Sequence, residues 1–182
     1  MFKKILIRTV IGLAAIIVVL VGVVATQPSD FRVERTANFS APPAGVFAQV
    51  NNFHNWEAWS PWAKLDPKAK NSFEGPSQGQ GAIFRWSGKN SVGEGSMTVV
   101  ESRPNELIRL KLDFVRPFAG ANDVEFAFKP AADQTAVTWS MAGKCNFIAK
   151  AIGLFIDCEK MVGGQLEQGL ANMKSVVEAP AP

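Results

Sequence analysis

The chain has 182 residues, with 19 Lys and Arg against 16 Asp and Glu, so its formal net charge is +3. Lys3, Lys4 and Arg8 account for this excess, and the rest of the sequence is formally neutral, without a cluster of Lys or Arg. Nucleic-acid binding is therefore excluded, because it needs a basic surface. The 13 Phe and 5 Trp, with no Tyr, provide apolar volume rather than rings with a polar tip.

An uncharged run rich in Ile, Val, Leu, Ala and Gly follows these three cations, from Thr9 to Ser29. Such a run is long enough for a helix that crosses a bilayer, which needs about 20 apolar residues. The sequence therefore predicts an N-terminal tail and membrane anchor over residues 1–27 and one compact domain over residues 28–182. Because a basic tail stays cytoplasmic, we expect a single-pass protein of the inner membrane with its domain on the periplasmic side.

A cleaved secretory signal is the alternative interpretation of the same residues. Small residues precede a possible cleavage site between Ala25 and Thr26. The apolar run exceeds the usual signal-peptide core of about 7–15 residues, which favours the anchor. Both interpretations place the domain on the same side of the membrane.

The first part of the domain combines one strand with two short helices. Residues 31–39 alternate as a strand does, and two prolines then open a short helix within residues 42–50. Residues 51–67 mix turn-forming polar residues with tryptophans. Trp56 and Trp59, three residues apart, fit one face of a second short helix, and the rest of this segment is expected to be a Trp-lined loop.

From residue 71 onward the pattern changes to a period of two, which is typical of strands. Residues 83–86 and 92–101 flank a turn and predict a hairpin. Residues 108–114 alternate strictly between apolar and charged side chains, and residues 124–129 and 137–141 continue the alternation. Together these segments predict an antiparallel sheet with one apolar face and one solvated face.

The C-terminal segment has apolar residues at helical spacing, which predicts a long helix across the apolar face of the sheet. These residues are Phe155, Cys158, Val162, Leu166, Leu170, Met173 and Val177. Gly163, Gly164 and Gly169 each cost such a helix about 1 kcal/mol relative to Ala, which close packing or a ligand would justify. The predicted fold class is α+β: a curved antiparallel sheet wrapped around a long C-terminal helix, preceded by one transmembrane helix.

Two cysteines, Cys145 and Cys158, lie in the expected extracytoplasmic domain. They form either a disulfide, which an oxidising compartment permits, or two buried free thiols. The one histidine, His54, lies far from them in the sequence, so they do not predict a metal site.

Few residues in this sequence predict catalysis. The lone His54 is interpreted as a loop residue, and alternation places Asp113 and Glu125 on the solvated face. Glu101 and Glu94 are weak candidates for a catalytic acid or base, because an inward position is open to both. We therefore expect no metal and no cofactor, and the sequence leans against an enzyme.

The aromatic set is the remaining candidate for a binding site, because a pocket for an apolar ligand has the same lining as a plain core. Both readings stay open for these residues. They are Trp59, Trp62, Phe84, Trp86, Leu110, Phe114, Phe126 and Trp139.

Several passages resemble the START/polyketide cyclase-like superfamily (SRPBCC), which has the helix-grip fold. Clear examples are APPAGVF at 41–47, NWEAWSPW at 55–62, TAVTWSM at 135–141 and EQGLANMK at 167–174. The resemblance covers almost all of residues 31–178. It implies an apolar pocket between sheet and helix, but the superfamily hosts lipid carriers, cyclases and dehydrases on one scaffold.

These observations support three functional hypotheses. The first is a membrane-anchored module that binds a hydrophobic small molecule or lipid between the sheet and the C-terminal helix. The second is an enzyme of the cyclase or dehydrase type that uses Glu101 or Glu94. The third is a cavity-free domain that binds other proteins at the membrane. The sequence does not predict an oligomeric state.

Overall fold

The computed structural model describes residues 2–89 and 92–179. Its contacts divide the chain into two compact units, each described by itself below. The first unit comprises residues 1–31 and 145–158, and the second comprises residues 32–144 and 159–182.

The first unit contains the helices α1 (Phe2–Thr26) and α4 (Phe147–Gly153), which contact one another. Residues Ile5–Thr26 are long and apolar enough to cross a membrane, a property that an N-terminal signal sequence shares. Among the described side chains of α1, only Val24 is buried. Helix α4 begins after Asn146, whose side-chain oxygen accepts a hydrogen bond from the backbone N–H of Ala149. The sequence had not predicted α4 as a separate helix.

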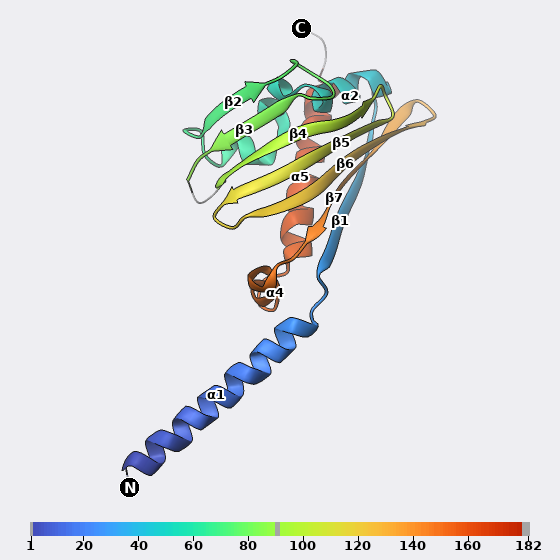
Figure 1. Ribbon diagram of the computed structural model, residues 1–182. Coiled ribbons are helices and arrows are strands. Elements are labelled where there is room, and N and C mark those ends of the chain that lie inside the picture. The colour runs from blue at the N-terminus through green and yellow to red at the C-terminus, as the bar shows by residue number, and fades with distance from the viewer. Residues whose placement is uncertain (1, 90–91, 180–182) are drawn as a thin grey trace. The chain divides into compact units, whose positions relative to one another are not determined.

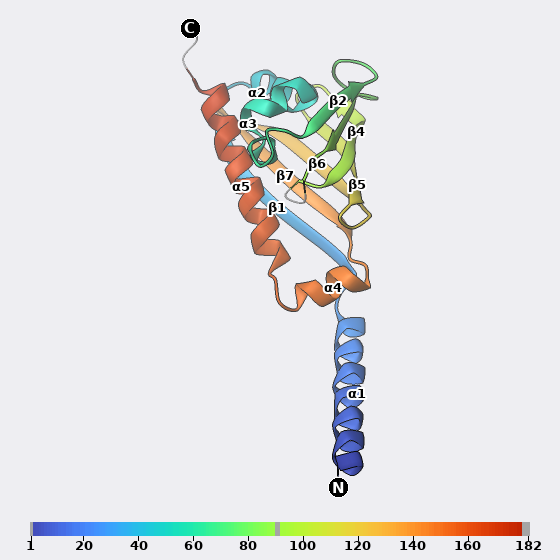
Figure 2. The same cartoon turned by 90° about the vertical axis from the view of Figure 1, so that its left-hand side faces the viewer.

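The second unit is built on a seven-stranded sheet with the strand order β1-β7-β6-β5-β4-β3-β2. The strands curve around helix α5 (Figures 1 and 2). Their bounds are β1 (Asp30–Phe39), β2 (Lys70–Glu74), β3 (Ile83–Ser87), β4 (Glu94–Arg103), β5 (Leu107–Arg116), β6 (Gly120–Ala131) and β7 (Gln134–Lys144). The predicted antiparallel sheet and the α+β helix-grip fold are therefore confirmed.

Short helices and α5 cover one face of the sheet (Figure 2). Helix α2 spans Pro43–Asn51 and α3 spans Trp56–Trp59, while Phe53–Asn55 and Pro61–Lys64 form single 3-10 turns. A proline lies in the first turn of α2, where its missing N–H costs no hydrogen bond. Both predicted short helices are present, but the expected loop after α3 begins as a helical turn.

Helix α5 (Cys158–Val177) is shorter at its start than the sequence predicted. Phe155, placed on its buried face by the spacing, precedes the helix and is 83% exposed, and Cys158 is exposed as well. The reason is a turn after α4, which keeps Phe155 outside α5 and leaves Cys158 at the first position of the helix. The side chains that α5 does bury are Leu166, Leu170 and Met173.

The three glycines of α5 have different surroundings. A Cβ on Gly169 would lie 2.6 Å from the ring of Trp139 and 3.2 Å from Pro61. A Cβ on Gly163 would meet the guanidinium of Arg35 on β1, whereas Gly164 has nothing within 4 Å. Close packing therefore explains Gly163 and Gly169 but not Gly164.

Arg35 ties β1 to α5. Its guanidinium forms ion pairs with Glu167 and, at 2.8 Å, with Glu159, both on the helix. The hydrogen bonds to Glu167 and then Glu159 raise the pKa of Arg35 above its ordinary value, so the pair of contacts stays charged. The alternation of residues 31–39 in the sequence does not predict this contact.

Both cysteines are free in this structure, so the disulfide considered from the sequence is not formed here. The alternative of two buried thiols does not match either, because Cys145 is half-buried and Cys158 is exposed. The physical reason is the turn at residues 154–157, which leaves Cys158 at the exposed start of α5.

Candidate functional site

A group of aromatic rings, called here the inner cluster, packs between the covered face of the sheet and the short helices. Its members are Trp56, Trp59, Trp62, Phe126 and Trp139. Phe126 and Trp139 stack with ring centroids 4.7 Å apart, and Trp59 meets Trp139 edge-on at 5.7 Å. Trp59, Phe126 and Trp139 are at most 1% exposed, so this part of the space between sheet and helices is filled.

Trp139 nevertheless leaves one polar atom unsatisfied. Its indole Nε1 is the one buried side-chain nitrogen or oxygen without a hydrogen-bond partner among the described residues. Trp56 and Trp59 differ, because their indole N–H groups donate to the backbone carbonyls of Val50 and Gln49. A buried donor without an acceptor costs about 1–3 kcal/mol, so the Trp139 N–H is available to an acceptor that reaches it.

A second group, the outer cluster, continues the aromatic surface over β2, β3 and β5. It consists of Phe73, Phe84, Trp86 and Phe114. Neighbouring centroids are 5.4 Å apart for Phe73 and Phe84, 5.7 Å for Phe84 and Trp86, and 5.9 Å for Trp86 and Phe114. None of the four is buried, although Phe53 links Phe84 to Trp56 of the inner cluster.

Trp86 owes its position to a glycine on the neighbouring strand. Gly95 pairs with Trp86, and a Cβ at Gly95 would lie 2.6 Å from the indole ring. The ring therefore lies flat over β4, where its Nε1 donates to the carbonyl of Val92.

The eight residues proposed from the sequence as core or pocket wall fall into two groups. Trp59, Leu110, Phe126 and Trp139 are fully buried. Trp62, Phe84, Trp86 and Phe114 are half-buried. The structure thus brings the first four together as packed core and leaves the second four with surface that a ligand could cover. Phe73, an exposed member of the outer cluster, was not proposed from the sequence, although its alternation with Ser72 and Glu74 was a usable signal.

Neither weak catalytic candidate faces the covered side of the sheet. Val100 is an extra residue in the pairing of β4 with β5, so Glu101 lies opposite Arg109 on the solvated face. The inward position that the sequence left open to Glu101 is therefore not adopted, because a bulge reverses the alternation. Glu101 and Glu125 both form ion pairs with Arg109.

Glu94 lies on the same solvated face. It pairs with Arg116 across the sheet and forms an ion pair with that residue at 2.7 Å. Its inward position, left open by the sequence, is therefore not adopted. A catalytic acid or base must contact the reacting group. Neither glutamate can contact a ligand on the covered face, because both side chains lie on the solvated face.

The carboxylate of Asp66 is buried and has a structural role. It accepts hydrogen bonds from the backbone N–H groups of Lys89, at 2.8 Å, and of Lys68. These bonds, the one from Lys89 above all, hold the pKa of Asp66 below its ordinary value of 3.8. Asp66 thereby fastens the loop after α3 to the turn between β3 and β4.

His54 is exposed and stacks on Phe73, with ring centroids 4.0 Å apart. Its ring Nδ1 and its backbone N–H both lie within hydrogen-bond distance of the side-chain oxygen of Asn52. This agrees with its interpretation as a loop residue. The described residues also contain no group of three or more His, Cys, Asp or Glu side chains arranged to hold a metal ion.

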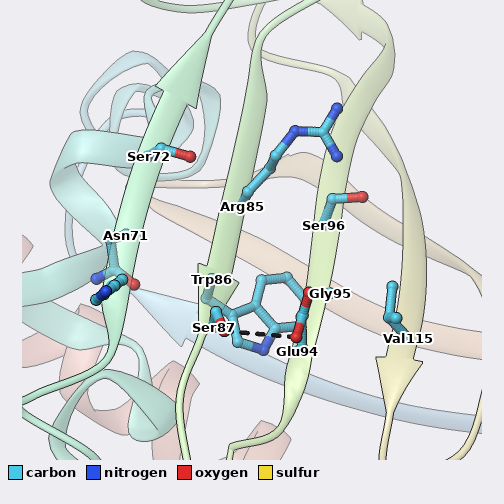
Figure 3. Close-up of a pocket in the computed structure, with 10 residues that line it drawn as sticks. Asn71, Ser72, Arg85, Trp86, Ser87, Glu94, Gly95, Ser96 and Val115 are labelled. Atoms are coloured by element: carbon cyan, nitrogen blue, oxygen red, sulfur yellow. Dashed lines mark hydrogen bonds between the residues drawn. The ribbon is translucent and has the colours of Figure 1, made fainter.

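Two surface pockets are described, and neither lies between the sheet and α5. One, of about 290 Å³, lies over β2 to β5 and is shown in Figure 3. Most of its polar side chains come from the solvated face, where Ser72 pairs with Arg85 and Arg85 pairs with Ser96. The other, of about 460 Å³, lies within the first unit beside α4.

Comparison with known families decides the relationship of this domain. The family described as polyketide cyclase / dehydrase and lipid transport matches residues 30–178. The chain belongs to this family. The match covers the whole sheet, α2, α3 and α5, and it confirms the resemblance inferred from the sequence. No curated protein matches the sequence.

Solved structures share this fold at low sequence identity. Protein MLL2253 from Mesorhizobium loti has a TM-score of 0.63 and 15% identity, covering 84% of this chain and all (100%) of that one. The Aha1 dimer from Colwellia psychrerythraea has a TM-score of 0.59 and 13% identity over 81% and 96% of the two chains. The di-domain ARO/CYC StfQ of the steffimycin biosynthetic pathway has a TM-score of 0.60 and 11% identity over 82% and 51%. At these identities the likeness establishes the fold alone.

Proposed function

We propose that this protein is a membrane-tethered module that binds a hydrophobic small molecule or lipid on the aromatic face of its sheet. The observation that carries the proposal is the buried N–H of Trp139, which has no acceptor among the described residues. A ligand with one hydrogen-bond acceptor on an apolar body would satisfy this donor. Pockets for such ligands are mainly apolar, with few polar groups that fix orientation.

The surroundings of Trp139 support this reading. Trp62 is half-buried, and its ring centroid lies 5.9 Å from that of Trp139, so partly open apolar surface lies beside the ring that carries the unsatisfied donor. The outer cluster adds apolar area on the same face. The family description includes lipid transport as well as cyclases, and lipid transport needs no catalytic carboxylate. With Glu94 and Glu101 on the solvated face, binding is favoured over catalysis.

A tether adds to the function that we propose. Helix α1 as an anchor would keep the domain at the periplasmic surface of the inner membrane. Holding a binding site near a bilayer raises the effective concentration of a ligand that is dissolved there. The proposal therefore concerns ligands that partition into membranes.

The packing of the inner cluster supports a second candidate, a cavity-free module that binds other proteins. Trp59, Phe126 and Trp139 are at most 1% exposed, so the space that they occupy is filled. On that reading the partner contacts the exposed surface and the interior serves stability alone. The two candidates differ in whether a small molecule accompanies the purified protein.

Native mass spectrometry of the full chain, released from detergent micelles, tests the proposal. We expect a reproducible additional mass that organic solvent removes. The variant Trp139→Phe removes the donor together with part of the ring volume, so it should retain several-fold less of this mass, while the cavity cost to stability is partly offset by the loss of the unsatisfied donor. Ser96→Ala, on the solvated face, is the matched control. A chain that stays free of ligand after incubation with a lipid extract would favour the protein-binding module.

A further inference from the structure

The segment of the first unit from Phe147 to Ile156, called here the α4 segment, has an unusual surface. Five large apolar side chains within ten residues remain exposed to solvent. They are Phe147 at 50%, Ile148 at 53%, Ile152 at 36%, Phe155 at 83% and Ile156 at 47%. Single exposed apolar residues are common, but a contiguous group of this kind marks an interaction surface.

The partner of this apolar surface is inferred from its position, because the segment is held close to the end of α1. The backbone N–H of Cys145 donates to the carbonyl of Ser29 at 2.7 Å, and Ser29 lies three residues beyond the end of α1. Three extended residues span at most about 11 Å. Cys145, two residues before the α4 segment, is therefore held close to the end of α1, the point at which a spanning helix leaves the hydrocarbon core.

Direct contact within the unit shortens this distance further. Helices α1 and α4 touch, and Val24 in the last turn of α1 is 4% exposed, whereas the other described side chains of α1 are exposed. The headgroup layer of a bilayer is about 5–8 Å thick on each side. A segment that packs against the last turn of a spanning helix consequently lies at the depth of the headgroups.

We propose that the α4 segment is a second, monotopic membrane contact, which inserts its apolar side chains at the boundary between headgroups and acyl chains beside α1. This inference rests on the proposed function only through the spanning role of α1. Interfacial segments bury their apolar side chains about 5–10 Å deep at this boundary. The most exposed member, Phe155, follows the helix and supplies a large apolar side chain for insertion.

A fluorescent label read against brominated lipids tests the depth of the segment in the full chain. The label, nitrobenzoxadiazole, is attached through Gly153→Cys after Cys145→Ser and Cys158→Ser have removed the native thiols. A Cβ at Gly153 meets nothing within 4 Å, so this site keeps all five apolar side chains in place. The vesicles contain phosphatidylcholine and phosphatidylglycerol, with the bromines carried near the carbonyl end of the acyl chains in one preparation and near their methyl end in a second, which reports on the centre of the bilayer.

Two reference positions use the same background. Ile16→Cys lies in the middle of α1, and Asp133→Cys lies in an exposed polar turn between β6 and β7. We expect quenching at position 153 but not at position 133. Phe155→Glu combined with Ile156→Glu should then reduce the quenching at 153 several-fold and leave that at 16 unchanged.

The reference positions separate this inference from the tether itself. Quenching at 16 without quenching at 153 overturns the second contact and leaves the anchor in place. Quenching at 153 without quenching at 16 supports the contact and overturns the spanning role of α1. An absence of quenching at both positions overturns both proposals.

Discussion

The inner and outer aromatic clusters lie on one face of one sheet, yet they are buried to different degrees. In the inner cluster, Trp59 and Trp139 are packed between the sheet and the helices and are at most 1% exposed. In the outer cluster, Phe84, Trp86 and Phe114 keep part of their surface exposed on β3 and β5. Both clusters consist of Trp and Phe, so the difference in burial comes from the elements that cover each cluster.

This difference in burial suggests that the two clusters have different roles. Rings covered by α3 and α5 contribute to stability, because their area is removed from water on folding. Rings that stay half-exposed contribute less to stability and leave apolar area for a ligand. Substitutions in the inner cluster should therefore mainly lower the free energy of unfolding. Substitutions in the outer cluster should mainly lower the fraction of protein that retains ligand.

The largest expected effect is on the inner cluster. Trp59→Ala removes a ring that is 0% exposed and should lower the free energy of unfolding by about 3–5 kcal/mol. Urea denaturation followed by circular dichroism measures this loss. A loss no larger than that of a half-buried ring would show that the inner cluster is not the packed centre.

Gly169→Ala tests how tightly α5 fits the inner cluster. Its Cβ would lie 2.6 Å from the ring of Trp139, so we expect a loss of about 1–3 kcal/mol from overpacking. Gly164→Ala is the matched control in the same helix, where open space should allow a gain of up to about 1 kcal/mol. Equal unfolding midpoints for the two variants would contradict the close contact.

Phe114→Ala examines the outer cluster. Because the ring is half-buried, we expect a loss of about 1–2 kcal/mol in the free energy of unfolding. The fraction of protein that carries the additional mass should fall more than this modest destabilisation accounts for. Retention equal to that of Ser96→Ala would exclude the outer cluster from the ligand surface.

The smallest expected effect is a dependence on pH near the outer cluster. The pKa of Asp66 is lower in the folded protein than its ordinary value of 3.8. Asp66 therefore contributes fully to the free energy of unfolding above pH 3.8, and this contribution is lost as the pH falls through the lower pKa of the folded state. Stability should decline over that acid range, and Asp66→Asn should flatten the decline. Asp133→Asn, in an exposed turn, is the control, and urea denaturation at several pH values gives the comparison.

The prediction from sequence was accurate where a local pattern sufficed. Strict alternation in residues 108–114 defined β5, and the Pro42-Pro43 step defined the start of α2. It was wrong where tertiary pairing changed the pattern. The extra residue Val100 turned Glu101 to the solvated face, and the turn after α4 removed Phe155 from the buried side of α5.

Periodicity by itself determined the fold class, the apolar N-terminal helix and the aromatic face of this protein, because each follows from the spacing of side chains along the chain. The tertiary structure alone decided which of those aromatic rings are buried, which polar atom among them stays unsatisfied, and where the apolar residues before α5 point. Burial and hydrogen bonding depend on the elements that pack against a residue, and those elements lie far away in the sequence.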